Sequence, residues 1–223
     1  MPATFLDSGL HRPALRVRAA WSPLLAASLF CAVLFLLLCV QVGGSRGALP
    51  FDEAAAALLS PYRSPGLLAS FALLTVLGSG NGVVLAGALA SACLALQRRW
   101  RLAAVFWGVL ACSGVSAWAV KVLVARPRPE FIEGFAASSP SFPSSHAVAA
   151  LAGYGFLAYV LARDARPATR WLAAVAATLL VVLVAGSRVM LGLHHASDVI
   201  GGLLLAGCWF LAGVLAARRM SSR

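Results

Sequence analysis

The chain has 223 residues, of which 61% are hydrophobic and 11% are charged, and its mean hydropathy is +0.89. This composition excludes a soluble globular domain and indicates a membrane protein. The formal net charge of +11 raises the alternative of a nucleic-acid partner. We expect none, because the positive charges form short clusters between apolar segments, whereas a nucleic-acid reader needs a solvated basic face.

Six apolar segments are long enough to cross a bilayer, whose core of about 30 Å requires roughly 20 residues of helix. They cover residues 20–42, 67–97, 102–124, 146–162, 171–189 and 198–217. The second contains the sequence GSGNG at residues 78–82, so we predict one bent crossing there. Before it, residues 43–66 contain an Ala-rich piece that we predict as a short surface helix without identifiable chemistry. The predicted fold class is all-α, an integral membrane bundle of six transmembrane helices over residues 20–217.

Arginine clusters indicate which side of the membrane each connection faces. Twelve of the 18 Lys and Arg residues lie before the first span, between the second and third, between the fourth and fifth, and after the sixth: Arg12, Arg16, Arg18, Arg98, Arg99, Arg101, Arg163, Arg166, Arg170, Arg218, Arg219 and Arg223. Short loops rich in Lys and Arg remain cytoplasmic. We therefore predict cytoplasmic tails at both ends, over residues 1–19 and 218–223.

Four other cations break this rule, because they gather at the outer ends of the third and fifth spans: Lys121, Arg126, Arg128 and Arg188. A desolvated cation is costly without an anionic partner, so this exception predicts a functional site. The same face receives His146, His194, His195 and Asp198. We therefore expect the site in the outer connections, residues 121–146 and 187–198.

Local geometry gives some of these residues a chemical use. Ser144 or Ser145 can cap the fourth helix, while free backbone N–H groups at its start face an anion. If the sixth helix begins near His194, Asp198 lies on the same face and can accept a hydrogen bond from the Nδ1–H group. Nε2 would then be free to attack. His195 is rotated by about 100° on that helix, so we choose His194 as the nucleophile.

Three segments resemble the signature motifs of the type-2 phosphatidic acid phosphatase and vanadium haloperoxidase superfamily. They are a lysine, six residues and Arg-Pro, from Lys121 to Pro129; Pro-Ser-x-His, from Pro143 to His146; and Ser-Arg, five residues, His, three residues and Asp, from Ser187 to Asp198. The three motifs occur in order, with the family's internal spacing, on one predicted face. One departure is Ser145, where the family usually has glycine.

The resemblance implies a membrane lipid phosphatase with His194, His146 and Asp198 as its catalytic residues. In the implied mechanism His194 attacks phosphorus, Asp198 orients it and stabilises the phosphohistidine, and His146 protonates the leaving oxygen. The implied phosphate-binding residues are Lys121, Arg128, Ser144, Ser145 and Arg188. Arg126 is a secondary candidate, because it lacks the six-residue interval from Lys121.

Alternatives to this interpretation come from other chemistry. Two histidines and an aspartate could form a metal site. Lys121, Arg128 and Arg188 would repel a metal ion but suit a phosphate dianion, so we predict hydrolysis without a metal or other cofactor. A vanadate-dependent haloperoxidase would use the same pocket, but that resemblance is to soluble proteins. A non-catalytic protein that binds or transports lipid phosphates is the alternative from a different class.

An outward site at headgroup level favours a lipid substrate whose tail lies between hydrophobic walls. Phosphatidate, phosphatidylglycerol phosphate and undecaprenyl pyrophosphate all fit, and beyond this lipid and the bilayer no partner is predicted. The Ala- and Arg-rich composition with almost no lysine is typical of a high-GC bacterium. We therefore predict a multi-pass protein of the inner (plasma) membrane, with its site facing the periplasm or exterior.

Overall fold

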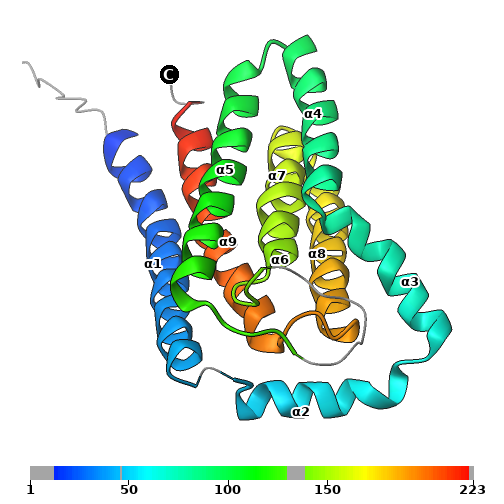
Figure 1. Cartoon of the computed structure of the whole chain (residues 1–223). Coiled ribbons are helices and arrows are strands. Elements are labelled where there is room, and N and C mark those ends of the chain that lie inside the picture. The colour runs from blue at the N-terminus through cyan, green and yellow to red at the C-terminus, as the bar shows by residue number, and fades with distance from the viewer. Residues whose placement is uncertain (1–12, 46, 130–138, 221–223) are drawn as a thin grey trace, which may run out of the picture.

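The computed structural model of the chain describes residues 13–45, 47–129 and 139–220, with side chains from residue 23 onward. Its helices are α1 (Pro13–Ser45), α2 (Pro50–Leu59), α3 (Pro65–Thr75), α4 (Gly80–Leu96), α5 (Trp100–Val124), α6 (Ser145–Ala150), α7 (Phe156–Ala162), α8 (Pro167–Met190) and α9 (Ala196–Arg219). No strand occurs in these ranges, so the predicted all-α class is confirmed (Figure 1). Much of the two predicted tails, residues 1–12 and 221–223, lies outside the described residues.

The described helices provide the predicted membrane spans. Five stretches are long and apolar enough to cross a bilayer, namely Pro23–Ser45, Trp100–Val124, Ser145–Ala162, Pro167–Met190 and Ala196–Arg219. α3 and α4 form a sixth candidate as a pair bent by 50°. Large apolar side chains such as Leu73, Leu123 and Trp171 are exposed on the outer surface, as expected where a helix faces lipid. The chain is therefore a multi-pass membrane protein.

Glycine permits the bend between α3 and α4. α3 ends in a 3₁₀ turn, Val76–Gly78, and Ser79 then caps α4 by accepting a hydrogen bond of 3.1 Å from the Gly82 N–H group. A Cβ atom at Gly82 would lie 2.8 Å from the carbonyl oxygen of Val76 and 2.9 Å from that of Leu77. A larger residue would therefore force this turn open, which agrees with the single bent crossing predicted over residues 67–97.

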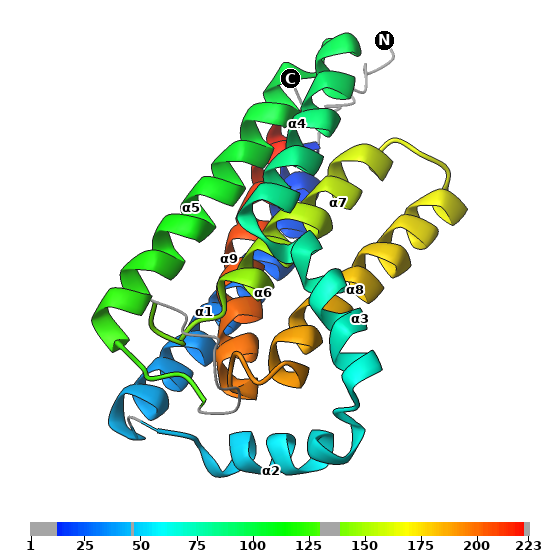
Figure 2. The ribbon, with the colours of Figure 1, turned by 45° about the vertical axis from the view of Figure 1, so that its right-hand side comes forward.

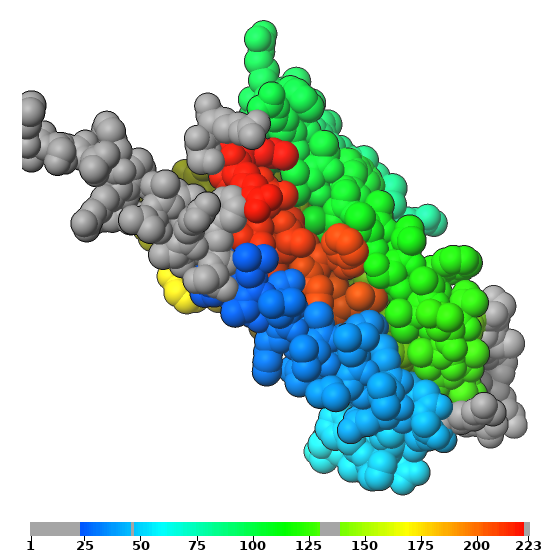
Figure 3. Space-filling model, turned by 90° about the vertical axis from the view of Figure 1, so that its left-hand side faces the viewer, coloured from blue at the N-terminus to red at the C-terminus, as the bar shows by residue number. Residues whose placement is uncertain are grey.

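α9 lies at the centre of the bundle. It contacts α1, α5 and α6, and Figure 1 shows its C-terminal part between α1 and α5. The space-filling view in Figure 3 shows the same neighbours, with α1 in blue, α9 in red and orange and α5 in green. Small residues on α9 admit buried rings, since a Cβ atom at Gly213 would lie 2.7 Å from Phe156 Cε2 and one at Gly201 would lie 2.5 Å from Phe142 Cε2. Such close packing holds helices together where lipid is as apolar as the side chains.

The two ends of the bundle carry different elements. α2 lies across one end, where α5 ends, α6 begins and α8 turns into α9 (Figure 1). The α4–α5 connection, the α7–α8 connection and the end of α9 lie at the other end (Figure 2). The predicted short helix within residues 43–66 is therefore present as α2. The sequence suggested no chemistry for this segment, and the structure buries Asp52 of α2 at this end of the bundle.

Candidate active site

Asp198 contacts His194 from the first turn of α9. The distance from His194 Nδ1 to Asp198 Oδ2 is 3.4 Å, and both residues are buried. The sequence predicted this contact by placing His194 and Asp198 on the same face of the sixth helix. That placement is wrong, because α9 begins at Ala196 and His194 precedes it. Asp198 instead accepts a 2.9 Å hydrogen bond from the backbone N–H of His195, as in a capping box. This cap holds the carboxylate close to the His194 ring.

Arg128 indicates which nitrogen of His194 has the lone pair. Its Nη1 lies 3.2 Å from His194 Nε2 and donates a hydrogen bond of 2.7 Å to the carbonyl oxygen of Leu193. A guanidinium can only donate, so Nε2 accepts and the proton of the neutral ring is on Nδ1, facing Asp198. Nε2 therefore has the lone pair that a nucleophile requires.

Burial keeps His194 in this neutral form. It lowers the pKa of His194 to about 4, although the hydrogen bond and charge of Asp198 oppose this shift. As the pH falls, the ring therefore stays neutral well below the ordinary histidine pKa of about 6.5. We expect ¹⁵N NMR of histidine-labelled protein to show an Nδ1-protonated neutral ring down to about pH 5, with a signal that is absent in His194→Ala. A signal that titrates near pH 6.5 would contradict this prediction.

The three predicted phosphate-binding cations come from different elements. Lys121 lies in the last turn of α5 and Arg188 in the last turn of α8, and both are buried. Arg128 follows α5, and its Nε donates a hydrogen bond of 3.0 Å to the carbonyl oxygen of Ser139. Lys121, Arg128 and Arg188 lie close enough to repel one another and to interact with His146. Such a convergence of like charges is unfavourable unless an anion binds between them.

Ser144 and Arg188 each present a buried polar atom without a partner. Ser144 Oγ and Arg188 Nε form no hydrogen bond with any described residue. Ser144 occupies the N-cap position of α6 as predicted, but its side chain makes no capping hydrogen bond. Leaving a buried donor unpaired costs about 1–3 kcal/mol, and a hydrogen bond to an anion would remove this cost for either atom.

His146 and Ser145 lie at the start of α6, and His146 is close enough to interact with these cations. His146 is partly buried, and a Cβ atom at Gly78 would lie 3.1 Å from its Cδ2. Ser145 is exposed. Both residues line an apolar groove of about 350 Å³, together with Val84 of α4 and Leu110 of α5. His146 therefore connects the cation cluster to a groove between membrane-spanning helices.

Arg126 belongs to a buried ion-pair network that sequence reasoning missed. Its Nη1 lies 2.6 Å from Asp198 Oδ1, and its Nη2 lies 2.7 Å from Asp52 Oδ2. Asp52 also accepts hydrogen bonds of 2.7 Å from the backbone N–H and from the hydroxyl of Ser197, and Ser141 donates to Asp198 Oδ2. The guanidinium of Arg126 is thus engaged with carboxylates. One sequence signal could have pointed to Asp52, which with Glu53 forms a pair of carboxylates in an Ala-rich helix.

Gly202 on α9 allows the chain before α6 to pack closely. A Cβ atom there would lie 2.7 Å from the carbonyl oxygen of Ser144 and 3.0 Å from Ala147 Cβ. We expect Gly202→Ala to lower the free energy of unfolding by about 1–3 kcal/mol through overpacking, measured by denaturation in detergent. Gly207→Ala is the matched control on the same helix, because its Cβ atom would meet only Cys31 Sγ, at 3.5 Å. Equal losses in both variants would contradict this explanation.

Comparisons of sequence and of structure relate this chain to known proteins. Residues 100–220 match the family model described as the PAP2 superfamily. Phosphatidylglycerophosphatase B of Bacillus subtilis (strain 168) is 36% identical over 88 residues, which are 39% of this chain and 43% of that protein. The match therefore spans less than half of that relative.

A solved structure shares the fold. The crystal structure of the first transmembrane PAP2 type phosphatidylglycerolphosphate phosphatase from Bacillus subtilis has a TM-score of 0.75 to this chain. The likeness covers 88% of this chain and 98% of that chain, at 24% sequence identity. At this identity the likeness shows that the helices are arranged in the same way. The shared arrangement covers much more of this chain than the 88 residues aligned in sequence.

Proposed function

Because the chain belongs to the PAP2 superfamily, we propose that it is a membrane phosphatase that hydrolyses a lipid phosphate through a phosphohistidine at His194. The observation that carries this proposal is the 3.2 Å distance between Arg128 Nη1 and His194 Nε2. At this distance the Arg128 guanidinium can bind a phosphate next to the lone pair of Nε2, while Asp198 contacts Nδ1 on the other side of the ring. A nucleophile and charge stabilisation for a phosphoryl group are thus combined in one buried site.

In the first step, His194 Nε2 attacks phosphorus. A P–N bond forms while the bond from phosphorus to the leaving lipid oxygen breaks. Arg128 releases Nε2 as the substrate enters and binds a phosphate oxygen instead, and Lys121, Arg188 and Ser144 donate to the other non-bridging oxygens. The negative charge of the bound substrate stabilises protonated His146, which gives its proton to the leaving oxygen.

In the second step, water attacks the phosphorus of the phosphohistidine. Neutral His146 accepts a proton from this water, the P–N bond breaks, and inorganic phosphate leaves. His194 thereby recovers its lone pair, and His146 regains the proton it gave in the first step. Asp198 balances the positive charge that the phosphorylated ring carries between the two steps. The cations of the site supply the charge stabilisation, so the proposed reaction needs no metal ion.

The groove beside His146 supports a lipid as the substrate. It opens between α4 and α5 and is lined mainly by apolar residues. An acyl or prenyl chain could lie there while its phosphate enters the cation cluster. Among lipids we propose phosphatidylglycerol phosphate first, because the sequence relative and the solved structure are both named for that activity. Phosphatidate and undecaprenyl pyrophosphate present the same terminal phosphate and are the alternatives.

Phosphate release by purified protein in detergent tests this proposal. We expect hydrolysis of phosphatidylglycerol phosphate to be at least about tenfold faster in kcat/KM than that of phosphatidate, undecaprenyl pyrophosphate or glycerol phosphate. A chelator should leave the rate within about twofold, since the charge stabilisation comes from side chains. Hydrolysis of none of these lipids would contradict the proposed function. Complete loss with a chelator, restored by one divalent metal, would contradict the metal-independent mechanism.

We also propose that the protein lies in the plasma membrane, with this site facing the periplasm or exterior and both termini in the cytoplasm. The arginines of the α4–α5 and α7–α8 connections support this orientation, because short loops rich in Arg remain cytoplasmic. A green fluorescent protein fused to the C-terminus should fluoresce in a bacterial host, and a C-terminal alkaline phosphatase should be inactive. The reverse pattern would contradict this orientation.

A further inference from the structure

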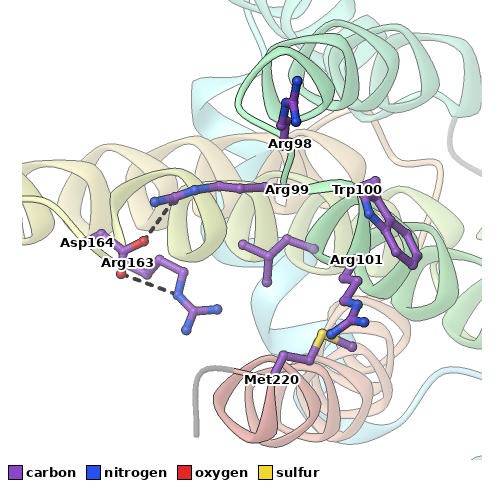
Figure 4. A pocket seen from close by; sticks show the side chains of 8 residues that line it. Arg98, Arg99, Trp100, Arg101, Arg163, Asp164 and Met220 are labelled. Atoms are coloured by element: carbon purple, nitrogen blue, oxygen red, sulfur yellow. Dashed lines mark ion pairs between the residues drawn. The ribbon is translucent and has the colours of Figure 1, made fainter. Parts of the chain in front are cut away.

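A second pocket lies at the end of the bundle opposite the candidate active site. It has a volume of about 420 Å³ and lies between the α4–α5 connection, the α7–α8 connection and the end of α9. The side chains that matter here are Arg99, Trp100, Arg101, Arg163, Asp164 and Met220 (Figure 4). None of them belongs to the motifs of the candidate active site, so this pocket requires a separate explanation.

The pocket carries an excess of positive charge. Four arginines line it, namely Arg98, Arg99, Arg101 and Arg163, against the single carboxylate of Asp164. Asp164 lies 2.8 Å from Arg99 and 3.7 Å from Arg163, and Arg163 also donates a hydrogen bond of 3.2 Å to the carbonyl oxygen of Ala217. These contacts hold two arginines from different connections around one carboxylate. Three positive charges remain in excess, which favours an anionic ligand.

Aromatic and apolar groups complete the same pocket. The guanidinium carbon of Arg101 lies 5.3 Å from the centroid of the Trp100 ring, within cation–π range. Trp100 is the first residue of α5 and is exposed, and Leu102 and Met220 also line the pocket. Tryptophan is enriched at the membrane–water interface, where its polar edge meets headgroups. A ligand that combines an anionic group with apolar groups therefore matches the pocket better than a fully hydrated ion does.

The position of the pocket along α5 indicates which lipids can reach it. α5 has 25 residues between Trp100 and Val124, which corresponds to about 37 Å of helix. This length crosses the hydrocarbon core, so the pocket lies at the headgroup level of one leaflet and the candidate active site at that of the other. Basic pockets between transmembrane helices are known binding sites for anionic lipid headgroups.

We propose that this pocket binds the phosphate group of an anionic phospholipid from the leaflet opposite the candidate active site. Arg99 and Arg101 contact the phosphate from the α4–α5 side, Arg163 contacts it from the α7–α8 side, and Trp100 lies beside the glycerol region. The proposal does not depend on turnover, and a protein without phosphatase activity would still bind this lipid.

Quenching of Trp100 fluorescence by brominated lipids tests the proposal. Full-length protein is placed in nanodiscs with brominated phosphatidylglycerol or brominated phosphatidylcholine, and Trp100→Phe supplies the signal of the other tryptophans. Brominated phosphatidylglycerol should quench the Trp100 component at least about tenfold more strongly than brominated phosphatidylcholine does. We expect this preference because each arginine near a headgroup contributes to anion binding. This preference should fall to about twofold or less in Arg99→Gln/Arg101→Gln.

Arg166→Gln is the matched control, because Arg166 is an exposed arginine of the α7–α8 connection that does not line the pocket. It should keep the preference within about twofold of the original value, because exposed charges are screened. No preference in the unmodified protein, or an equal loss in Arg166→Gln, would overturn the proposal. Added inorganic phosphate should leave the preference unchanged, and abolition by phosphate would show that the pocket takes a free anion instead of a lipid.

Discussion

Replacing His194 with alanine should lower the rate of phosphate release by about 10⁴-fold or more, because the variant loses the Nε2 lone pair that lies beside Arg128. The rate is measured with purified protein and phosphatidylglycerol phosphate. Acid-labile, alkali-stable ³²P labelling should appear in the unmodified protein after rapid quenching and be absent from the variant. Unchanged turnover in His194→Ala would sink the phosphohistidine mechanism. Lipid binding without turnover in the unmodified protein would favour the non-catalytic alternative.

His195→Ala is the matched control for this experiment. Its imidazole is adjacent in sequence, but His195 occupies the N-cap position of α9, and it is its backbone N–H that bonds to Asp198. The alanine variant keeps this backbone contact, so we expect turnover within about tenfold of the original. A loss as large as that of His194→Ala would mean that disturbing the turn before α9 is enough to stop the reaction, and the assignment of His194 would lose its support.

Asp52→Asn should give the second largest effect, although Asp52 lies on α2 and outside the three sequence motifs. Burial alone would raise the pKa of Asp52, but hydrogen bonds from Leu49, Ser197 and Arg126 lower it below its ordinary value. Asp52 is therefore ionised and shares Arg126 with Asp198. In the variant, Asp198 is the remaining carboxylate paired with Arg126. We expect the Arg126 guanidinium to attract Asp198 more strongly and to move its carboxylate away from His194. We expect kcat to fall about 10²-fold, as a small misplacement of a catalytic group does.

The same variant should be less stable. Breaking one side of a buried ion pair costs about 3–5 kcal/mol, so the free energy of unfolding in detergent should fall by up to this amount. Glu53→Gln is the matched control, because Glu53 is the next residue on α2 and is exposed. Its activity and stability should stay close to those of the unmodified protein. If Glu53→Gln were as harmful as Asp52→Asn, the effect would come from the charge of α2 as a whole and not from the network.

The sequence predicted the membrane-spanning helices well because the signal for them is local. Each span needs only a long apolar segment, since helical hydrogen bonds are satisfied within the segment itself. The bent crossing was predictable for the same reason, because the glycines between α3 and α4 mark the break. Segment ends were less accurate, and α9 begins at Ala196 instead of near His194. The capping role of Asp198 explains this difference, because its carboxylate bonds to the backbone N–H of His195.

By itself, the sequence determined that this chain is an all-α membrane protein and which motif residues to consider, because composition, helix length and spacing are properties of neighbouring residues. The tertiary structure alone decided how Arg126 is used and that Asp52 belongs to the site. Asp52 and Asp198 are 146 positions apart in the chain, yet both lie within 2.7 Å of the Arg126 guanidinium. Such an ion pair depends on how α2 crosses the end of the bundle, and no local pattern records that arrangement. The physical reason is that burying these charges is favourable only when all their partners are brought together.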